Sequence, residues 1–195
     1  MRNVFITSDY HIGHKNILTL TDRWKYCDSI KEHDELIISR HNSIVDKKDI
    51  VYDLGDFSFT GSVDYTVEVL QRLNGKRVML WGNHDTNLRK AFNRGMLDSM
   101  INSGKLQLIG PSDKSMHTTL TINHNKQKYH LSHYSFRSWP GAFHGAIHLY
   151  GHSHNNLPGI YNSMDVGVDT SNLYPWNIED IKKIMDNKNT QFSER

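Results

Sequence analysis

The sequence contains a single cysteine, Cys27, and no apolar run that approaches the ~20 residues of a membrane-spanning helix. One cysteine excludes an internal disulfide and fits a reducing compartment, so Cys27 is expected to be an ordinary thiol. The chain also enters a strand-like run at once, without the apolar core of a signal peptide. We therefore expect a cytoplasmic protein with no membrane segment.

The chain also has little net charge. The 195 residues carry a formal net charge of +2, with 23% charged and 37% hydrophobic residues. This balance is typical of a soluble globular protein and defines no nucleic-acid surface, no membrane contact and no oligomeric state. The length suits one domain with a sizeable core, so residues 1–195 are predicted to form a single domain.

In its first half the chain alternates short β-branched or aromatic runs with amphipathic segments. Residues 4–6, 50–54 and 77–81 read as buried strands, whereas residues 29–45 and 63–73 carry apolar side chains at helical spacing. This alternation is typical of a parallel sheet covered by helices. Right-handed crossovers would place the carboxyl ends of all three strands at one edge.

The second half changes character. Residues 116–123 and 128–132 alternate around a turn-forming segment, which predicts an antiparallel hairpin. Residues 146–150 and 164–168 are predicted to be further strands, and a last helix is expected to begin near residue 178.

Several of the 13 histidines have a structural interpretation. His33 and His41 are expected at the surface or edge of the first long helix, and His117 and His124 on the hairpin surface. His148 alternates with apolar neighbours in a strand, where a hydrogen-bonded structural histidine is at least as well favoured as one that supports a ligand.

Other histidines recur with Asp and Asn just after apolar runs. The clusters are Asp9/His11, Asp56, Asn83/His84, His133 and His152/His154. Asp9 and His11 are two residues apart, so in an extended segment their side chains share a face and could ligate one divalent metal. Each cluster alone fits an ordinary polar turn. Their recurrence at successive strand ends indicates one common site.

The order Asp-x-His, Gly-Asp, Gly-Asn-His-Asp, a lone His and Gly-His-x-His resembles the signature of the calcineurin-like metallophosphoesterase superfamily. The match runs from Asp9 to His154, and residues 8–17 and 164–169 are similar to small stand-alone bacterial and phage-type members. The resemblance implies an α/β fold, namely a two-sheet β-sandwich flanked by helices on both outer faces.

The resemblance also implies a two-metal site. One metal would be held by Asp9, His11, Asp56 and His154, and the other by Asp56, Asn83, His133 and His152. A bridging carboxylate offsets the repulsion between two cations about 3.5–4 Å apart. Mixed nitrogen and oxygen ligands favour two divalent transition-metal ions, with manganese preferred and iron, zinc or nickel as alternatives.

The implied activity is hydrolysis of phosphomono- or phosphodiesters by a hydroxide that bridges the metals, with His84 protonating the leaving oxygen. The expected partner is a phosphate-ester substrate, with nucleotides among the candidates. Two alternatives stay open: a non-catalytic scaffold of the same fold that binds a partner protein, and a nuclease. Retention of His84 and of every expected ligand argues against the scaffold. A nuclease would need a basic, aromatic groove, and for this the sequence offers only a modest candidate in Arg137 and Trp139.

One position departs from the family pattern. Many relatives read Gly-Asp-x-x-Asp, in which the second Asp orients the catalytic histidine, whereas Phe59 stands there in this chain. The partner of His84 is therefore left open. Loop residues expected to rim the site are His14, Lys15, Tyr134, Arg137, Trp139 and His144. Of these, His14 and Arg137 are the candidates for substrate contact, since a guanidinium can bind phosphate through two hydrogen bonds, and Trp139 could stack on a base.

Overall fold

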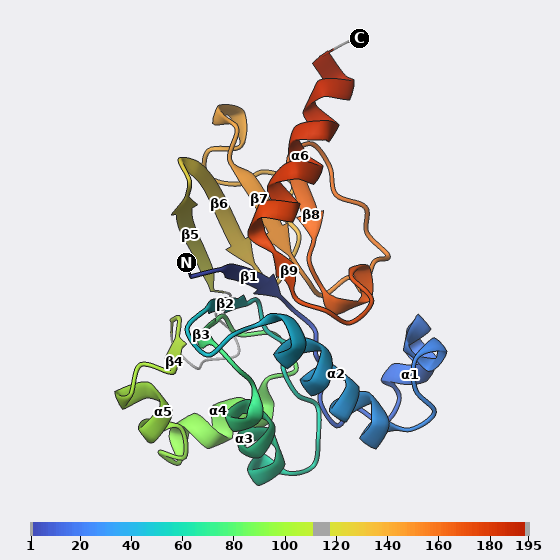
Figure 1. Cartoon of the computed structure of the whole chain (residues 1–195), viewed down its shortest axis with the longest axis vertical. Coiled ribbons are helices and arrows are strands. Elements are labelled where there is room, and N and C mark those ends of the chain that lie inside the picture. Colours follow the sequence, from blue (N-terminus) through green and yellow to red (C-terminus); the bar gives the residue numbers. More distant parts are fainter. Residues whose placement is uncertain (1, 111–117, 194–195) are drawn as a thin grey trace.

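The computed structural model of the chain describes residues 2–110 and 118–193, which form two mixed β-sheets and their covering helices (Figure 1). The first sheet has the strand order β4-β3-β2-β1-β9. Its strands are β1 (Val4–Thr7), β2 (Ile50–Asp53), β3 (Lys76–Met79), β4 (Leu106–Leu108) and β9 (Trp176–Asn177). β1 to β4 run parallel, and β9 pairs antiparallel with β1. The predicted α/β class is confirmed.

The second sheet has the order β5-β6-β7-β8. Its strands are β5 (Thr119–His124), β6 (Gln127–Ser132), β7 (Ile147–Tyr150) and β8 (Ser163–Asp165). β5 and β6 form the predicted hairpin, whose turn residues Asn125 and Lys126 have φ of 46° and 66°, as a tight hairpin turn requires. β6, β7 and β8 then run parallel. Residues 116 and 117, part of the predicted first arm, lie outside the described residues.

Serine side chains cap the starts of two of the α-helices. They are α1 (Ile17–Leu20), α2 (Ile30–Ile44), α3 (Val63–Arg72), α4 (Thr86–Asn93), α5 (Asp98–Asn102) and α6 (Ile178–Ser193), with a short 3-10 turn η1 (Asp22–Lys25) after α1. Ser29 accepts a hydrogen bond from the Glu32 amide, and Ser62 accepts one from the Tyr65 amide, so both predicted helix starts are confirmed. Among the described residues, no helix combines the length and the apolar character needed to cross a membrane.

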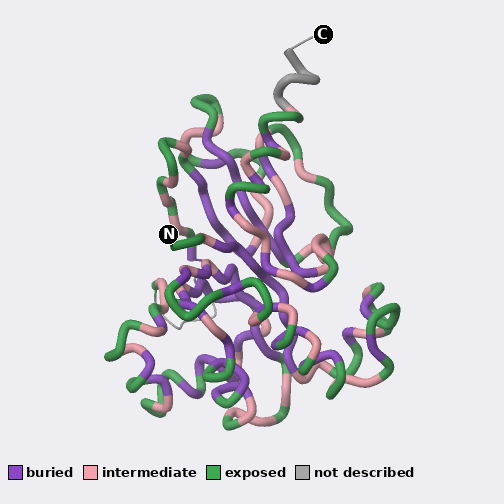
Figure 2. The backbone as a smooth tube through the Cα atoms, in the orientation of Figure 1, coloured by how far each residue is buried: buried purple, intermediate pink, exposed green. Residues whose placement is uncertain are grey.

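Two large buried clusters hold these elements together. One joins the first sheet to α2–α5 through residues such as Ile37, Leu70 and Leu88, and these helices gather on one side of that sheet (Figure 1). The other contains side chains from both sheets and from α6, among them Ile6 and Leu131. Buried residues accordingly lie in the centre of the molecule rather than along its outer loops (Figure 2).

The strand register brings several loops to a common edge. Thr7 pairs with Asp53, and Asp53 pairs with Met79, so β1, β2 and β3 end side by side, as predicted. In the second sheet Leu131 and Leu149 are likewise partners near the ends of β6 and β7. The polar clusters predicted from the sequence follow the ends of β1, β2, β3, β6 and β7.

Two elements differ from the sequence prediction. β9 was not predicted, because its two residues are too few to show a strand periodicity. Residues 164–168 do not continue as a strand, since β8 ends at Asp165. The Asp165 carboxylate accepts a hydrogen bond from the Gly167 amide, and the chain turns there into a 3-10 helix, η3 (Val168–Thr170).

The expectation that His33 and His41 lie at a surface or edge is wrong, because both are 0% exposed. His41 Nε2 donates to the Asn74 carbonyl at 2.9 Å, and its Nδ1 lies 2.6 Å from the Tyr10 hydroxyl. Burial, with the charge of Arg77 second, lowers the pKa of His41 to about 3. Polar residues on the inner face of α2 therefore have partners outside the helix, which helical periodicity cannot reveal.

His148 has the structural role, which is one of the two alternatives that the sequence left open. It is fully buried in β7, its Nδ1 donates to the His130 carbonyl, and its Nε2 accepts from the Phe136 amide, both at 3.0 Å. Both ring nitrogens are thus used within the fold.

Candidate metal centre

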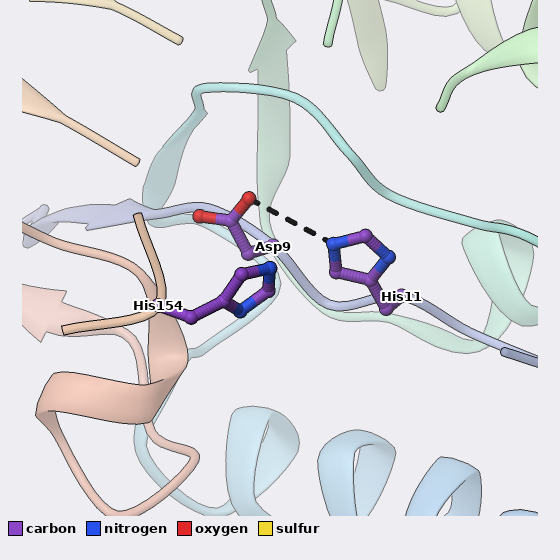
Figure 3. Close-up of side chains that lie close together, drawn as sticks. All are labelled: Asp9, His11 and His154. Carbon is purple, nitrogen blue, oxygen red and sulfur yellow. Dashed lines mark ion pairs between the residues drawn. The ribbon is translucent and has the colours of Figure 1, made fainter. Parts of the chain in front are cut away.

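The predicted ligands come from five different loops and converge. The ligand atoms of Asp9, His11 and His154 lie within 4.8 Å of one another (Figure 3). Those of Asp56, His133 and His152 form a second group by the same criterion. Residues 145 positions apart in the sequence therefore share one location, and each of the two groups could hold a metal ion.

Asp56 lies between the two groups. Its Oδ2 is 3.6 Å from Nε2 of His11 and 3.3 Å from Nε2 of His133. Its other oxygen, Oδ1, accepts a hydrogen bond from the His84 amide at 2.7 Å. Asn83 joins the second group, since its Oδ1 lies 3.0 Å from His133 Nε2. One carboxylate thus contacts both sets of side chains.

The backbone at these positions is strained. Left-handed φ values occur at Asp9 (61°), His11 (52°), Asp56 (55°), His152 (68°) and His154 (47°). Such values are uncommon for residues other than glycine, and strained conformations cluster at functional sites. Five of the seven predicted ligands carry this signal.

Glycines let the loops approach the carboxylates. A Cβ on Gly151, directly before His152, would lie 2.4 Å from Oδ2 of Asp9. The His152 amide donates to that same oxygen at 2.9 Å. The glycine of the Gly-His-x-His motif is therefore required by the packing against Asp9.

The first group contains buried polar atoms that lack hydrogen bonds. In the described part of the chain, Oδ1 of Asp9 and both ring nitrogens of His11 have no hydrogen-bond partner. His11 Nε2 lies 3.9 Å from Asp9 Oδ1, as the dashed line in Figure 3 marks. Buried polar atoms normally have partners, so this pair fits a site built to bind a cation. Burial raises the pKa of Asp9 to about 6 and lowers that of His11 well below its usual value.

The second group is more strongly paired. Burial opposes the charge on His133, but the contact with Asp56 and the charges of Asp9 and Asp56 raise the pKa of His133 to about 9. Burial also disfavours a charged Asp56, yet His133 and then His11 hold its pKa well below the usual range. His133 Nδ1 donates to the Leu54 carbonyl at 3.1 Å, which directs Nε2 at Asp56. A metal bound there would replace the Nε2 proton.

The donor set fits divalent transition metals. It combines imidazole nitrogens with carboxylate and amide oxygens, a mixture that suits manganese, iron, zinc or nickel better than calcium or magnesium. Asn83 and His152 are exposed and His84 is half-buried, so one side of the site faces solvent.

Two residues that support the site were missed by sequence reasoning. Arg23 is 1% exposed, donates to both oxygens of Asp169 at 2.7 Å, and donates to the Asp9 carbonyl at 2.6 Å. Asp169 in turn lies 2.7 Å from His154 Nδ1. Burial disfavours the charged carboxylate, but Arg23 and then His154 hold the pKa of Asp169 well below its usual range. The two residues are 146 positions apart in polar segments, so no local pattern indicates the pair.

Asp85 ties the loops after β2 and β3 together. Its carboxylate accepts hydrogen bonds from the amides of Asp56 (3.0 Å), Phe57 (2.8 Å) and Gly82 (2.8 Å). Burial, with the nearby charge of Asp56 second, raises its pKa to about 7. The last residue of the Gly-Asn-His-Asp motif thus positions the backbone of a ligand rather than acting as one.

His84 lies beside the two groups. Its ring centroid is 5.4 Å from that of His11 and 4.7 Å from that of Phe59, which meets it edge to face. Phe59 packs in the same way on His14 at 4.7 Å. Phe59 therefore supplies an aromatic ring that contacts both histidines.

The loop after β6 reaches the site only at its start. Tyr134 donates to Asn83 Oδ1 at 3.2 Å, and its ring lies 4.6 Å from that of His152. Lys15, with His14, lines a cavity next to Phe59.

Arg137, Trp139 and His144 lie elsewhere. The loop folds back along the second sheet, and the exposed Arg137 lines a separate cavity of about 430 Å³ with Phe143 and Tyr161. Trp139 is 6% exposed and donates its indole N–H to the Ala146 carbonyl, so the expected base-stacking surface is closed. His144 ends the turn η2 (Ala142–His144) at the start of β7, the end opposite to His152.

The chain matches no model of a known protein family. It is 31% identical over 170 residues to the gene 66 protein of Mycobacterium phage D29, a match that covers 80% of this chain and 81% of the phage protein. The chain therefore belongs to the family of that gene 66 protein. It is also 28% identical over 198 residues to the uncharacterized protein MJ1445 of Methanocaldococcus jannaschii, covering 95% of this chain and 93% of that protein.

The fold is shared with a solved structure. The protein of unknown function AQ665 from Aquifex aeolicus superimposes with a TM-score of 0.67 at 19% identity, covering 94% of this chain and 100% of that one. At this identity the likeness concerns the fold alone.

Proposed function

We propose that the protein is a dinuclear-metal phosphoesterase of the calcineurin-like metallophosphoesterase superfamily, which hydrolyses phosphomono- or phosphodiesters. The observation that carries this proposal is the position of Asp56, whose Oδ2 contacts a histidine of each ligand group. A carboxylate shared in this way suits two cations that must lie close together. As part of this proposal, the two sheets form the two-sheet sandwich expected from the sequence.

The predicted ligands would form two overlapping sets, one for each metal. Asp9, His11 and His154 would hold one metal, Asn83, His133 and His152 the other, and Asp56 both. Bound metals of this kind polarise phosphoryl oxygens and lower the pKa of a coordinated water to about 7. Because most ligands are neutral imidazoles, the site keeps little negative charge that would repel a phosphate ester. Asn83 and His152 face solvent, which gives a substrate access to this side.

His84 would donate a proton to the leaving oxygen. Its amide is tied to Asp56 Oδ1 at 2.7 Å, so its position is fixed relative to both groups. Phe59 packs on the ring and limits the orientations it can adopt. A positioned general acid of this kind contributes about 10²–10⁴-fold to a rate.

Metal reconstitution tests this proposal. Chelated protein is loaded separately with manganese, iron, zinc or nickel, the metal content is counted, and hydrolysis of p-nitrophenyl phosphate and bis(p-nitrophenyl) phosphate is measured. We expect about two ions per chain, activity that depends on them, and loss of both in Asp56→Asn. Asp64→Asn, a change to an exposed carboxylate at the start of α3, serves as the control. Hydrolysis by the chelated protein, or full metal content in Asp56→Asn, would overturn the proposal.

A further inference from the structure

A further cavity adjoins the first ligand group at His154. It has a volume of about 420 Å³ and lies between η1 and the loops that follow β7 and η3, at the side of the molecule where α1 stands out in Figure 1. His154 and Asp169 form part of its wall. This volume lies within the range of small-molecule sites, and His154 belongs both to the cavity wall and to one of the ligand groups.

Aromatic side chains line this cavity at its exposed side. Trp24 is 58% exposed and Tyr26 is 39% exposed. Tyr26 is held in place, since its hydroxyl donates to Asn172 Oδ1 at 2.6 Å and the Arg40 guanidinium lies 4.7 Å from its ring. Large exposed aromatic residues next to a polar cavity are typical of binding surfaces rather than of folding cores.

The charged side chains that line the cavity are paired with one another. Arg23 binds Asp169 at 2.7 Å, and Lys25 Nζ lies 2.6 Å from Asp22 Oδ2. Because these pairs neutralise each other, the cavity suits an uncharged group better than a second phosphate.

Amide side chains supply the polar part of the lining. Asn155 and Asn156 are exposed there, and their side chains make no hydrogen bond within the described residues. An amide offers a donor and an acceptor side by side, which matches the edge of a nucleobase. Trp24 offers a flat ring on which any base can stack, and Lys25 Nζ lies over this ring, 5.7 Å from its centroid.

We propose that this cavity binds the base of a nucleoside phosphate whose phosphoryl group lies at the metal centre. The base would stack on Trp24, and its edge would meet Asn155 and Asn156. This inference rests on the proposed phosphoesterase function and names its substrate class. The cavity next to His154, whose charged side chains are paired, is the feature that would distinguish a nucleotide from a simple phosphate ester.

Binding is tested first, with a probe that cannot be hydrolysed. Manganese-loaded protein is titrated into 2-aminopurine riboside, whose fluorescence is quenched when the base stacks on an indole. We expect saturable quenching that adenosine reverses and ribose 5-phosphate does not. Trp24→Ala should weaken binding about tenfold or more, in line with the usual contribution of base stacking. Phe143→Ala, a change to a 93% exposed ring at the cavity of Arg137, is the matched control and should bind like the parent.

Turnover is tested second. The ratio of kcat/KM for the p-nitrophenyl ester of thymidine 5′-monophosphate to that for methyl p-nitrophenyl phosphate measures the preference for a nucleoside at a fixed leaving group. We expect a preference of at least tenfold that Trp24→Ala removes and Phe143→Ala keeps.

The two experiments separate the inference from the function on which it rests. If plain aryl esters are hydrolysed but the riboside does not bind, or if ribose 5-phosphate displaces it as well as adenosine does, the base site is refuted and the phosphoesterase stands. If the riboside binds through Trp24 but no ester is hydrolysed, the phosphoesterase is refuted and the base site stands. Equal nucleoside preference in Trp24→Ala and the parent would also refute the base site.

Discussion

Gly82 lies so close to Asp56 that a Cβ atom built on it would be 2.2 Å from both the backbone nitrogen and Oδ1 of Asp56. The loop after β3 is thereby pressed against the loop after β2, and the Asp85 carboxylate accepts hydrogen bonds from the amides of both residues. The Gly-Asn-His-Asp motif therefore requires glycine at position 82, because the backbone and carboxylate of Asp56 leave no room for a Cβ atom.

Gly82→Ala should displace Asp56. The added methyl group cannot fit without movement of the Asp56 backbone, and overpacking of this kind costs about 1–3 kcal/mol of stability. Because Asp56 would serve both ligand groups, we expect the bound metal to fall below one ion per chain. Urea unfolding and elemental analysis measure the two effects. Gly61→Ala is the matched control, since nothing lies within 4 Å of its added Cβ. Two tightly held ions in Gly82→Ala would contradict the role given to Asp56.

Asp169→Asn should weaken metal binding at the group that contains His154. The carboxylate accepts from His154 Nδ1 at 2.7 Å, which directs Nε2 toward Asp9 and His11. Loss of such a partner typically lowers metal affinity 10–100-fold. Competition with a chromophoric chelator measures this affinity.

The substitution also breaks the buried pair with Arg23, so folding needs its own measurement. Thermal unfolding in chelator reports the stability of each variant without metal. Asp165→Asn is the comparison, because Asp165 is a buried carboxylate of the same segment that hydrogen-bonds Ser153 rather than a predicted ligand. Unchanged affinity in folded Asp169→Asn would show that His154 needs no such support.

Much of the fold could be predicted because local patterns and long-range packing agree. The apolar runs of β1, β2 and β3 and the stripe of α3 need only periodicity to be found. β9 was not predicted, because its two residues form a strand only through their pairing with Phe5 and Ile6 and show no strand pattern of their own. The burial of His41 was not predicted for a similar reason, since its partners Tyr10 and Asn74 lie in loops far from it in the sequence.

The site shows the same division. Asp9, His11 and Asp56 could be selected because each follows a strand, and parallel strands end at one edge. The left-handed backbone of these residues could not be foreseen, because Asp and His adopt it far less readily than glycine does. The position of Arg137 was expected from loop membership alone, and loop membership does not determine which way a loop folds.

His84→Ala should retain its metals and lose rate selectively. An alkoxide needs a proton to leave, whereas p-nitrophenolate leaves without one. We therefore expect a loss of about 10²–10⁴-fold on alkyl phosphate esters and a much smaller loss on p-nitrophenyl esters. The slope of log kcat against leaving-group pKa measures the difference, with His124→Ala in the β5–β6 hairpin as the control. A full rate on an alkyl ester would exclude His84 as the general acid.

Acid should destabilise the protein through His41. Burial lowers its pKa from 6.5 to about 3, so between these values the unfolded chain binds a proton that the folded chain does not. Stability contributed by the neutral ring is therefore fully present above pH 6.5 and is lost as the pH falls toward 3. The slope from one such group reaches about 1.4 kcal/mol per pH unit. Urea unfolding in chelator at pH 7, 6 and 5 measures it.

His41→Gln isolates this contribution. Glutamine can still donate to the Asn74 carbonyl but does not titrate, so we expect lower stability at pH 7 and a shallower fall toward pH 5. The fall should not vanish, because burial also lowers the pKa of His148 to about 4. His124→Gln replaces a partly exposed histidine paired with Glu179 and should keep the parent slope. If His41→Gln and the parent lose stability equally between pH 7 and 5, the buried ring at position 41 is not the source of the acid sensitivity.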